Sequence, residues 1–292
     1  MASSNSHNVL FDVQGPRSRR LFMILNVVGV LLVLALAWVV LGKLADQGQL
    51  EASKWTALFT ARTWENFLLP GLWQTIRAAL LAVLLSIVFG LVFGLGRLSQ
   101  LAPVRAVSTL VVEFFRAVPV LVMMIFFYLG LGRTGLVEPA NAPFWAVVLG
   151  LMFYNGSVIA ELIRSGVHQL PKGQREAALV IGLTPSRSLR MIELPQALTA
   201  MLPSMVSQFV VILKDTALGY IITYPELLAS ARRLGAGDGN ILQTLLLAAL
   251  VFVLINYLLT AVAAWLARFL SFRTAGRAQP AEGPLAAEET KV

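Results

Sequence analysis

The sequence predicts an all-α membrane protein with about six transmembrane helices. Hydrophobic residues make up 58% of the chain, whereas only 13% of the residues are charged. That composition leaves too few polar side chains to cover the surface of a water-soluble domain. The apolar residues also gather into runs of about twenty, the length at which a helix crosses a bilayer. The charged residues fall between these runs, as expected for loops at the membrane surface.

Charge and composition exclude several other classes of protein. The formal net charge is +8, which alone would suit either nucleic acid or an anionic membrane face. Because the charges lie in loops between apolar runs, we expect contact with membrane lipid and not with nucleic acid. The chain has no cysteine and only two histidines, His7 and His168, far apart in sequence. We therefore expect no disulfide, no metal site and no cofactor.

The chain is expected to have five parts. They are a polar tail (1–20), a transmembrane helix (21–42), an extracytoplasmic interfacial segment rich in aromatic residues (43–70), a membrane core (71–270) and a disordered tail rich in Ala, Gly, Pro and Glu (271–292). The first apolar run follows three arginines and contains a small-residue triplet at 35–37, as a signal peptide does. It continues well past that triplet, so an uncleaved helix is favoured.

Five further spans are expected in the membrane core, at 72–95, 107–131, 144–167, 203–222 and 241–270. Gly90 and Gly94, in the first of them, would let a neighbouring helix approach closely. Glu113 and Arg116 lie three residues apart on one helical face, so we expect them either to pair or to lie at the membrane interface.

The arginine distribution predicts the orientation. Six spans put both termini on one side, and most arginines of the tails and loops fall on that side. Arg133, Arg232 and Arg233 are the exceptions on the opposite side. Because cytoplasmic loops carry the excess of positive charge, both termini and the loop at 172–196 are expected in the cytoplasm of a bacterial plasma membrane.

The stretch from Lys172 to Pro195 looks like two short surface helices. Gly182 suits the turn after the first helix, because glycine adopts the left-handed conformation without a Cβ clash. Thr184 and Pro185 supply an N-cap and a first-turn proline for the second, and Pro195 is expected to end it. The product would be a helix-turn-helix hairpin whose polar side carries four basic residues, Lys172, Arg175, Arg187 and Arg190.

This hairpin resembles the E-A-A-x3-G-x9-I-x-L-P signature of permease subunits of bacterial ATP-binding-cassette (ABC) importers. All seven positions match: Glu176, Ala177, Ala178, Gly182, Ile192, Leu194 and Pro195. In that family the loop docks in a cleft of the ATPase, so the resemblance implies that these residues couple the chain to an ATPase. It also implies the type I importer fold, with five core helices preceded here by an extra N-terminal one.

Other stretches resemble the polar amino acid permeases of the histidine and glutamate type. They are Gln74-Thr75, 114–119, 154–161, 194–197, 213–216 and 225–228. Two features depart from the common pattern: Ala117-Val118 stands where Gly-Thr is usual, and the N-terminal span is additional. That span and residues 47–55 are similar to the permeases of actinobacterial glutamate uptake systems. The resemblance implies glutamate as the solute, whereas the core alone leaves acidic, amide and basic amino acids open.

The resemblance also implies the partners. They are two copies of a separate ATPase, a second and related permease chain forming a heterodimer, an extracytoplasmic solute-binding protein and the amino acid itself. This chain has no phosphate-binding loop of the G-x-x-x-x-G-K-[ST] type. ATP would therefore be bound and hydrolysed by the partner, and the chain itself is not expected to be an enzyme.

A candidate solute pathway is marked by the polar residues expected nearest to membrane depth: Asn155, Glu161, Lys214, Asp215 and Thr216. A charge there costs roughly 2.5 to 3.5 kcal/mol, so each needs a partner or a wet cavity. One arrangement pairs Lys214 with Glu161 across helices. The alternatives are a purely structural set of ion pairs and a direct contact of Lys214 or Thr216 with the solute carboxylates.

Two other functions remain in competition. An ion-coupled secondary transporter would work without an ATPase and usually shows an internal repeat, which is not visible between the halves of this sequence. A membrane enzyme or sensor would need a nucleophile, a metal set or an acid-base pair, none of which the sequence displays.

Overall fold

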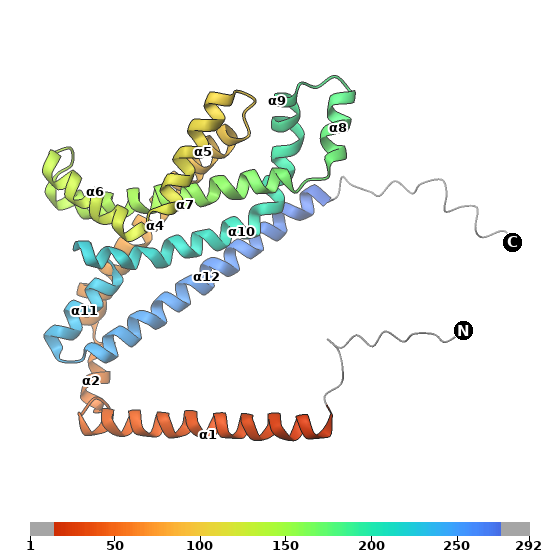
Figure 1. The fold of residues 1–292 in the computed structure, drawn as a ribbon. Coiled ribbons are helices and arrows are strands. Elements are labelled where there is room, and N and C mark those ends of the chain that lie inside the picture. Colours follow the sequence, from red (N-terminus) through yellow and green to blue (C-terminus); the bar gives the residue numbers. More distant parts are fainter. Residues whose placement is uncertain (1–14, 276–292) are drawn as a thin grey trace, which may run out of the picture. The chain divides into compact units, whose positions relative to one another are not determined.

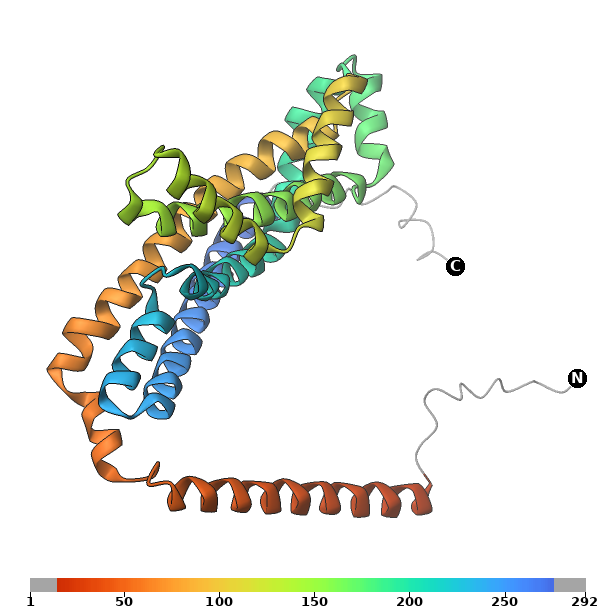
Figure 2. The same ribbon diagram turned by 60° about the vertical axis from the view of Figure 1, so that its left-hand side comes forward.

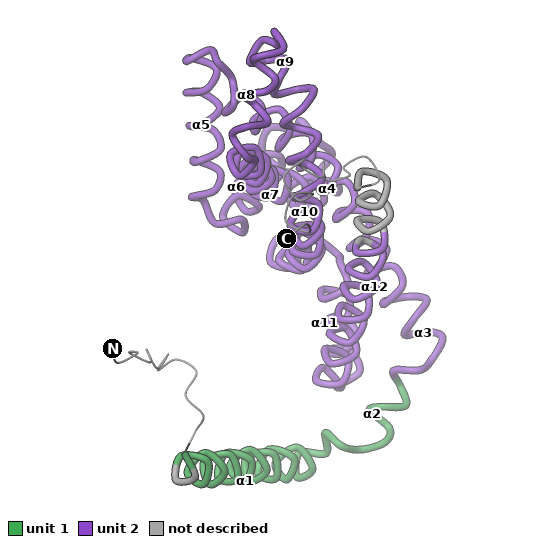
Figure 3. Tube along the Cα trace, turned by 90° about the vertical axis from the view of Figure 1, so that its right-hand side faces the viewer, with its two compact units in different colours: residues 1–57 green, residues 58–292 purple. Residues whose placement is uncertain are grey.

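The computed structural model describes residues 15–275, which are helical with connecting turns. The chain divides into two compact units, residues 1–57 and 58–292 (Figure 3). The first unit contains α1 (Pro16–Asp46) and α2 (Ala52–Thr56). The helix α1 is apolar around its whole circumference, as suits a span surrounded by lipid. It starts a turn earlier than the predicted residue 21.

A nearly continuous helical run starts at the boundary of the two units, Ala57, and continues into the second unit. A 3₁₀ turn (Ala57–Phe59) is followed by α3 (Ala61–Thr63), a π turn (Trp64–Leu68) and α4 (Leu69–Arg97). Thr60 caps α3, since its hydroxyl oxygen accepts a hydrogen bond from the Thr63 amide at 3.4 Å. The helical stretch 61–97 is long and apolar enough to cross a membrane, and it contains the span predicted at 72–95.

The predicted span at 107–131 is not one continuous helix. The structure divides it into α5 (Ala102–Ala117) and α6 (Val120–Thr134), whose axes differ by 99°. The break lies at Val118, which is extended (φ −83°, ψ 127°) because the residue before a proline is forced out of the helical region. Pro119 also lacks the N–H that would continue the helix. The described residues thus contain five long apolar helices, or six spans when this bent pair is counted as one.

Close packing of α4 against α7 forms the centre of the second unit. A 3₁₀ turn (Pro139–Asn141) leads into α7 (Ala142–His168). A Cβ atom on Gly90 would collide with Ile159, and one on Gly94 would lie 3.1 Å from the carbonyl oxygen of Ala160. The predicted close approach at these two glycines is therefore confirmed. The core beside this crossing is apolar and fully buried, and it includes Ala78, Ala82, Met124, Val147 and Leu151.

The remaining elements run back across the unit. They are α8 (Lys172–Val180), α9 (Pro185–Ser188), a π turn (Leu189–Glu193), α10 (Leu194–Asp215), a 3₁₀ helix (Thr216–Ile222), α11 (Leu227–Asp238) and α12 (Ile241–Ala275). Figures 1 and 2 place α8 and α9 at one end of the second unit and α11 at the other. Residues 271–275, predicted to be disordered, are helical. The rest of that tail, and residues 1–14, lie outside the described residues.

The helix α11 is fixed firmly at its first turn. The buried Glu226 carboxylate accepts hydrogen bonds from the amides of Leu228 and Ala229, at 2.7 and 2.6 Å. The Leu227 amide donates to the hydroxyl oxygen of Thr75 on α4, at 3.1 Å. Burial nevertheless raises the pKa of Glu226 to about 7, because removing a carboxylate from water disfavours its charged form.

Candidate functional site

The predicted helix-turn-helix hairpin is present as α8 and α9. Gly182 follows α8 with φ 85°, and the Leu183 amide donates to the Ala178 carbonyl at 3.1 Å, which closes the turn as in a Schellman motif. Thr184 caps α9, because its hydroxyl oxygen accepts from the Arg187 amide at 3.4 Å. The local backbone chemistry of this stretch thus produces the predicted turn.

The prediction that Pro195 ends the second helix is wrong. The chain continues from α9 through the π turn directly into α10, and Pro195 occupies the first turn of α10. The proline follows a π turn, in which the Leu194 amide bonds to the Leu189 carbonyl in place of the regular α-helical pattern, so the missing Pro195 amide does not end the helical run. The hairpin is therefore attached rigidly to a long apolar helix.

One hydrogen bond lies within the second arm of the hairpin and another connects that arm to α8. Glu193 is buried, and its carboxylate accepts a hydrogen bond from the Ser188 hydroxyl at 2.7 Å. The side-chain amide of Gln196 on α10 donates to the side-chain oxygen of Gln174 on α8, at 3.4 Å. A cavity of about 420 Å³ lies between α8, α9 and the loop that joins α4 to α5. The hydrogen bonds therefore fix the conformation of the hairpin and of the surface that it exposes.

The seven signature residues occupy different environments. Glu176 and Ala177 are exposed on α8, whereas Ala178 is only 1% exposed and packs within the chain. Gly182 is exposed at the turn. Ile192 and Leu194 are half-buried and Pro195 is exposed. Only part of the signature is therefore available to a partner.

An exposed apolar patch on the hairpin was missed by the sequence analysis. It consists of Leu179, Val180 and Ile181, which are 42%, 86% and 74% exposed. The four basic residues predicted for the polar side are also exposed: Lys172, Arg175, Arg187 and Arg190. An apolar centre with a charged rim is typical of a protein-protein contact. In the sequence this patch is visible only as an apolar triplet directly before Gly182, which does not by itself differ from residues that face lipid.

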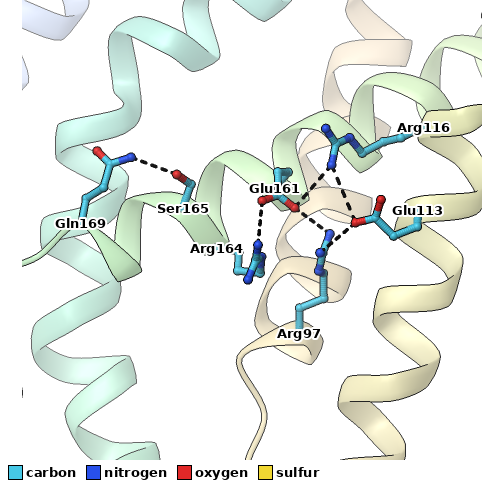
Figure 4. A network of polar contacts seen from close by, with 7 residues as sticks. All are labelled: Arg97, Glu113, Arg116, Glu161, Arg164, Ser165 and Gln169. Atoms are coloured by element: carbon cyan, nitrogen blue, oxygen red, sulfur yellow. Dashed lines mark hydrogen bonds and ion pairs between the residues drawn. The ribbon is translucent and has the colours of Figure 1, made fainter.

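A network of five charged residues joins three helices of the second unit (Figure 4). Arg97 of α4 lies 2.8 Å from Glu161 of α7 and 3.0 Å from Glu113 of α5. Arg116 lies 3.5 Å from Glu161 and 3.8 Å from Glu113. Arg164 lies 3.1 Å from Glu161. The five charges form one contiguous cluster.

Burial differs across this network. The Arg97 side chain is only 6% exposed, so its two carboxylate partners are needed to offset the loss of hydration. The expected pairing of Glu113 with Arg116 is confirmed. The expected pairing of Glu161 with Lys214 is wrong. Glu161 forms ion pairs with three arginines instead. The exposed Lys214 forms no ion pair with any residue that the structure describes.

The other candidate pathway residues do not form one cluster with Glu161. Asn155 is fully buried and its side chain donates to the Leu151 carbonyl at 3.0 Å, while its oxygen accepts from Gln208 of α10. Thr216 is buried, with its hydroxyl bound to the Leu213 carbonyl at 2.7 Å. Both residues are thus satisfied within the protein. A small cavity of about 330 Å³ lies instead beside Glu113, Arg116 and Tyr154.

Comparison with known proteins agrees with this geometry. The family model described as the inner membrane component of binding-protein-dependent transport systems matches residues 86–274. The chain is 44% identical over 236 residues to the glutamate transport system permease protein GluD of Corynebacterium glutamicum, covering 81% of this chain and 85% of that protein. It is 29% identical over 207 residues to the glutamate/aspartate import permease protein GltK of Escherichia coli, covering 69% of this chain and 92% of that protein.

Solved structures show the same fold. The crystal structure of an amino acid ABC transporter with histidines matches with a TM-score of 0.64 and 26% sequence identity, over 70% of this chain and 94% of that chain. An inward-facing structure of the MetNI methionine ABC transporter matches with a TM-score of 0.59 at 19% identity, over 69% and 94%. The chain belongs to the family of inner membrane components of binding-protein-dependent transport systems, as an ABC importer permease for amino acids.

Proposed function

We propose that this permease imports glutamate and is coupled to its ATPase through the α8–α9 hairpin. The coupling rests on one observation above all, the exposed apolar patch of Leu179, Val180 and Ile181 on a hairpin carrying the permease signature. Glutamate as the solute is supported by the relative at 44% identity, named as a glutamate transport permease. An ion-coupled secondary transporter finds no support among these relatives.

The hairpin transmits force because it is stiff and directly attached to long helices. Glu176 and Ala177 present the outer face of α8 to the ATPase, and the apolar patch fills a pocket on it. The exposed arginines around the patch orient the contact, and each contributes little alone in water. Movement of the hairpin is then carried into α7 and α10, the helices that flank it.

We infer the composition of the complex from the match to the family of binding-protein-dependent transport systems. The complex contains two copies of the ATPase, a second related permease chain and an extracytoplasmic solute-binding protein. The hairpin and both termini face the cytoplasm, supported by the excess of arginine on that side. The permease itself needs no cofactor and catalyses no reaction, because ATP is bound by the partner.

The solute pathway is assigned in part. Glu161 serves as a structural ion-pair member, supported by its three arginine partners. Asn155 and Thr216 shape the helix packing, since their polar groups are already hydrogen-bonded. Lys214 is the residue left to meet the solute carboxylate, with Asp215 beside it, because its side chain is exposed and forms no salt bridge with a described residue.

The coupling proposal is tested by Val180→Asp in the assembled complex. Placing a charge in an apolar contact removes the transfer energy of a valine, about 1.5 to 3 kcal/mol, and adds a desolvation cost. We expect at least a tenfold loss of ATPase affinity, measured by co-purification and by ATP-driven glutamate uptake into proteoliposomes. The matched control is Leu136→Asp, which changes an equally exposed apolar residue in the loop after α6. Full ATPase retention by Val180→Asp would refute the contact.

A further inference from the structure

The helix α11 has two contrasting faces. Its buried face consists of Leu227, Ser230, Ala231, Leu234 and Gly235. The opposite face consists of Arg232, Arg233, Ala236 and Gly237, all exposed. No atom lies within 4 Å of the place that a Cβ on Gly237 would occupy. Two arginines therefore lie beside two small exposed residues, Ala236 and Gly237.

The two arginines of this face are uncompensated. The Arg232 guanidinium lies over the Tyr220 ring, 4.7 Å from its centroid, which restricts its position without neutralising its charge. Arg233 makes no ion pair with a described residue. Asp238, the carboxylate at the end of α11, lies 3.6 Å from Arg62 instead. In addition, Glu226 is buried at the other end of the helix, where it binds backbone amides.

A lipid surface does not fit this face. A helix lying on a membrane buries large apolar residues such as Leu, Phe or Trp beneath its cations. Within α11, no large apolar side chain is exposed, and the exposed apolar residues of the preceding 3₁₀ helix are Tyr220, beneath Arg232, and Ile221. The end of the bundle opposite the α8–α9 hairpin is also where the positive-inside rule disfavours arginine. These two arginines therefore need an explanation other than membrane anchoring or topology.

We propose that the face formed by Arg232, Arg233, Ala236 and Gly237 docks the solute-binding protein, through an acidic patch on that protein. The inference rests on the proposed function, which puts α11 on the extracytoplasmic side and makes the binding protein a partner. Charge complementarity favours this occupant, since exposed cations raise the association rate of a protein with a negative surface. The small residues let the partner approach the helix closely, and the capped first turn of α11 keeps the surface rigid.

The test uses the complete complex in nanodiscs of neutral lipid, with solute-loaded binding protein added. The measurement is the binding-protein concentration that half-maximally stimulates ATP hydrolysis. For Arg232→Glu/Arg233→Glu we expect this concentration to rise about tenfold, with unchanged basal and maximal hydrolysis. The dependence of stimulation on salt should also become weaker. Arg232→Gln/Arg233→Gln should show a smaller rise in the same direction.

The matched control is Arg133→Glu, which reverses another exposed arginine predicted on the same side. It should change the half-maximal concentration less than twofold. An equal rise in this control would overturn the docking surface, because net charge alone would then explain the effect. An unchanged value in the double variant, or a change seen only with anionic lipid, would overturn it as well. A wild-type complex that ignores the binding protein would refute the proposed function itself, and the docking surface with it.

Discussion

Replacing Glu161 by glutamine should destabilise the permease more than replacing Arg97, although Arg97 is the more buried residue. The network holds three arginines and two carboxylates, a net charge of +1. Glu161→Gln raises that charge to +2 and leaves Arg164 without a carboxylate. Arg97→Gln lowers it to zero and leaves Glu161 with two cations, at 3.1 and 3.5 Å. The difference arises from which charges remain, not from which side chain is removed.

The magnitude follows from the geometry. Removing one partner of a buried pair costs about 3 to 5 kcal/mol, because the other charge stays buried and unpaired. That cost applies to Glu161→Gln, since Arg97 keeps only Glu113, whose side chain is 53% exposed and therefore screened by water. For Arg97→Gln we expect about 1 to 2 kcal/mol, mainly lost hydrogen bonds.

The assay is the apparent melting temperature of the purified protein in detergent. Glu161→Gln should lower it by roughly 10 °C and Arg97→Gln by less than half of that. The double variant restores the net charge to +1, so its loss should be smaller than the sum of the single losses. A larger loss for Arg97→Gln, or additive losses in the double variant, would show that the five residues do not act as one electrostatic unit.

Two further predictions concern the packing of α4 and the first turn of α11. Gly90→Leu should disrupt the crossing of α4 with α7 and abolish stable accumulation of the protein in the membrane. The control Gly130→Leu should be tolerated, because no atom lies within 4 Å of the added Cβ. Equal accumulation of the two variants would contradict the close packing at Gly90. The pKa of Glu226 is about 7 in the folded state and 4.5 ordinarily. Between pH 4.5 and pH 7 the folded protein therefore keeps a proton on Glu226 that the unfolded chain has lost. Stability should fall by up to about 3 kcal/mol as the pH rises from 5 to 8, and a Glu226→Gln variant with the same pH dependence of melting would refute this.

Local chemistry was predictable from the sequence wherever a few neighbouring residues decide the structure. Gly182 and Thr184 specify a turn and a cap through their own backbone preferences, and the hairpin formed as expected. Pro119 and Pro195 show the limit of this reasoning. The same residue type breaks a helix at Pro119 and lies within a continuous helical run at Pro195. Hydropathy along the chain does not distinguish these outcomes, because both prolines lie in apolar surroundings.

Partners across helices were less predictable. Glu161 could pair with any cation at a similar depth, and the sequence offered Lys214 as well as three arginines. The choice depends on how α4, α5 and α7 cross, which is set by small residues such as Gly90 and Gly94. The exposed patch on α8 was hidden for another reason. Apolar residues in a membrane protein are expected in lipid, so an apolar triplet on a loop gives no separate signal.

The network and the hairpin are connected through α7. Glu161 and Arg164 lie on its last two turns, and only residues 169–171 separate its end from α8. The side chain of Gln169 also donates to the Ser165 hydroxyl at 2.9 Å, which extends the ordered end of the helix (Figure 4). A displacement of the hairpin therefore acts on the part of α7 that the arginines tie to α4 and α5. In our proposal, these ion pairs make three helices respond together to one ATPase contact, so weakening them should impair uptake more than ATPase binding.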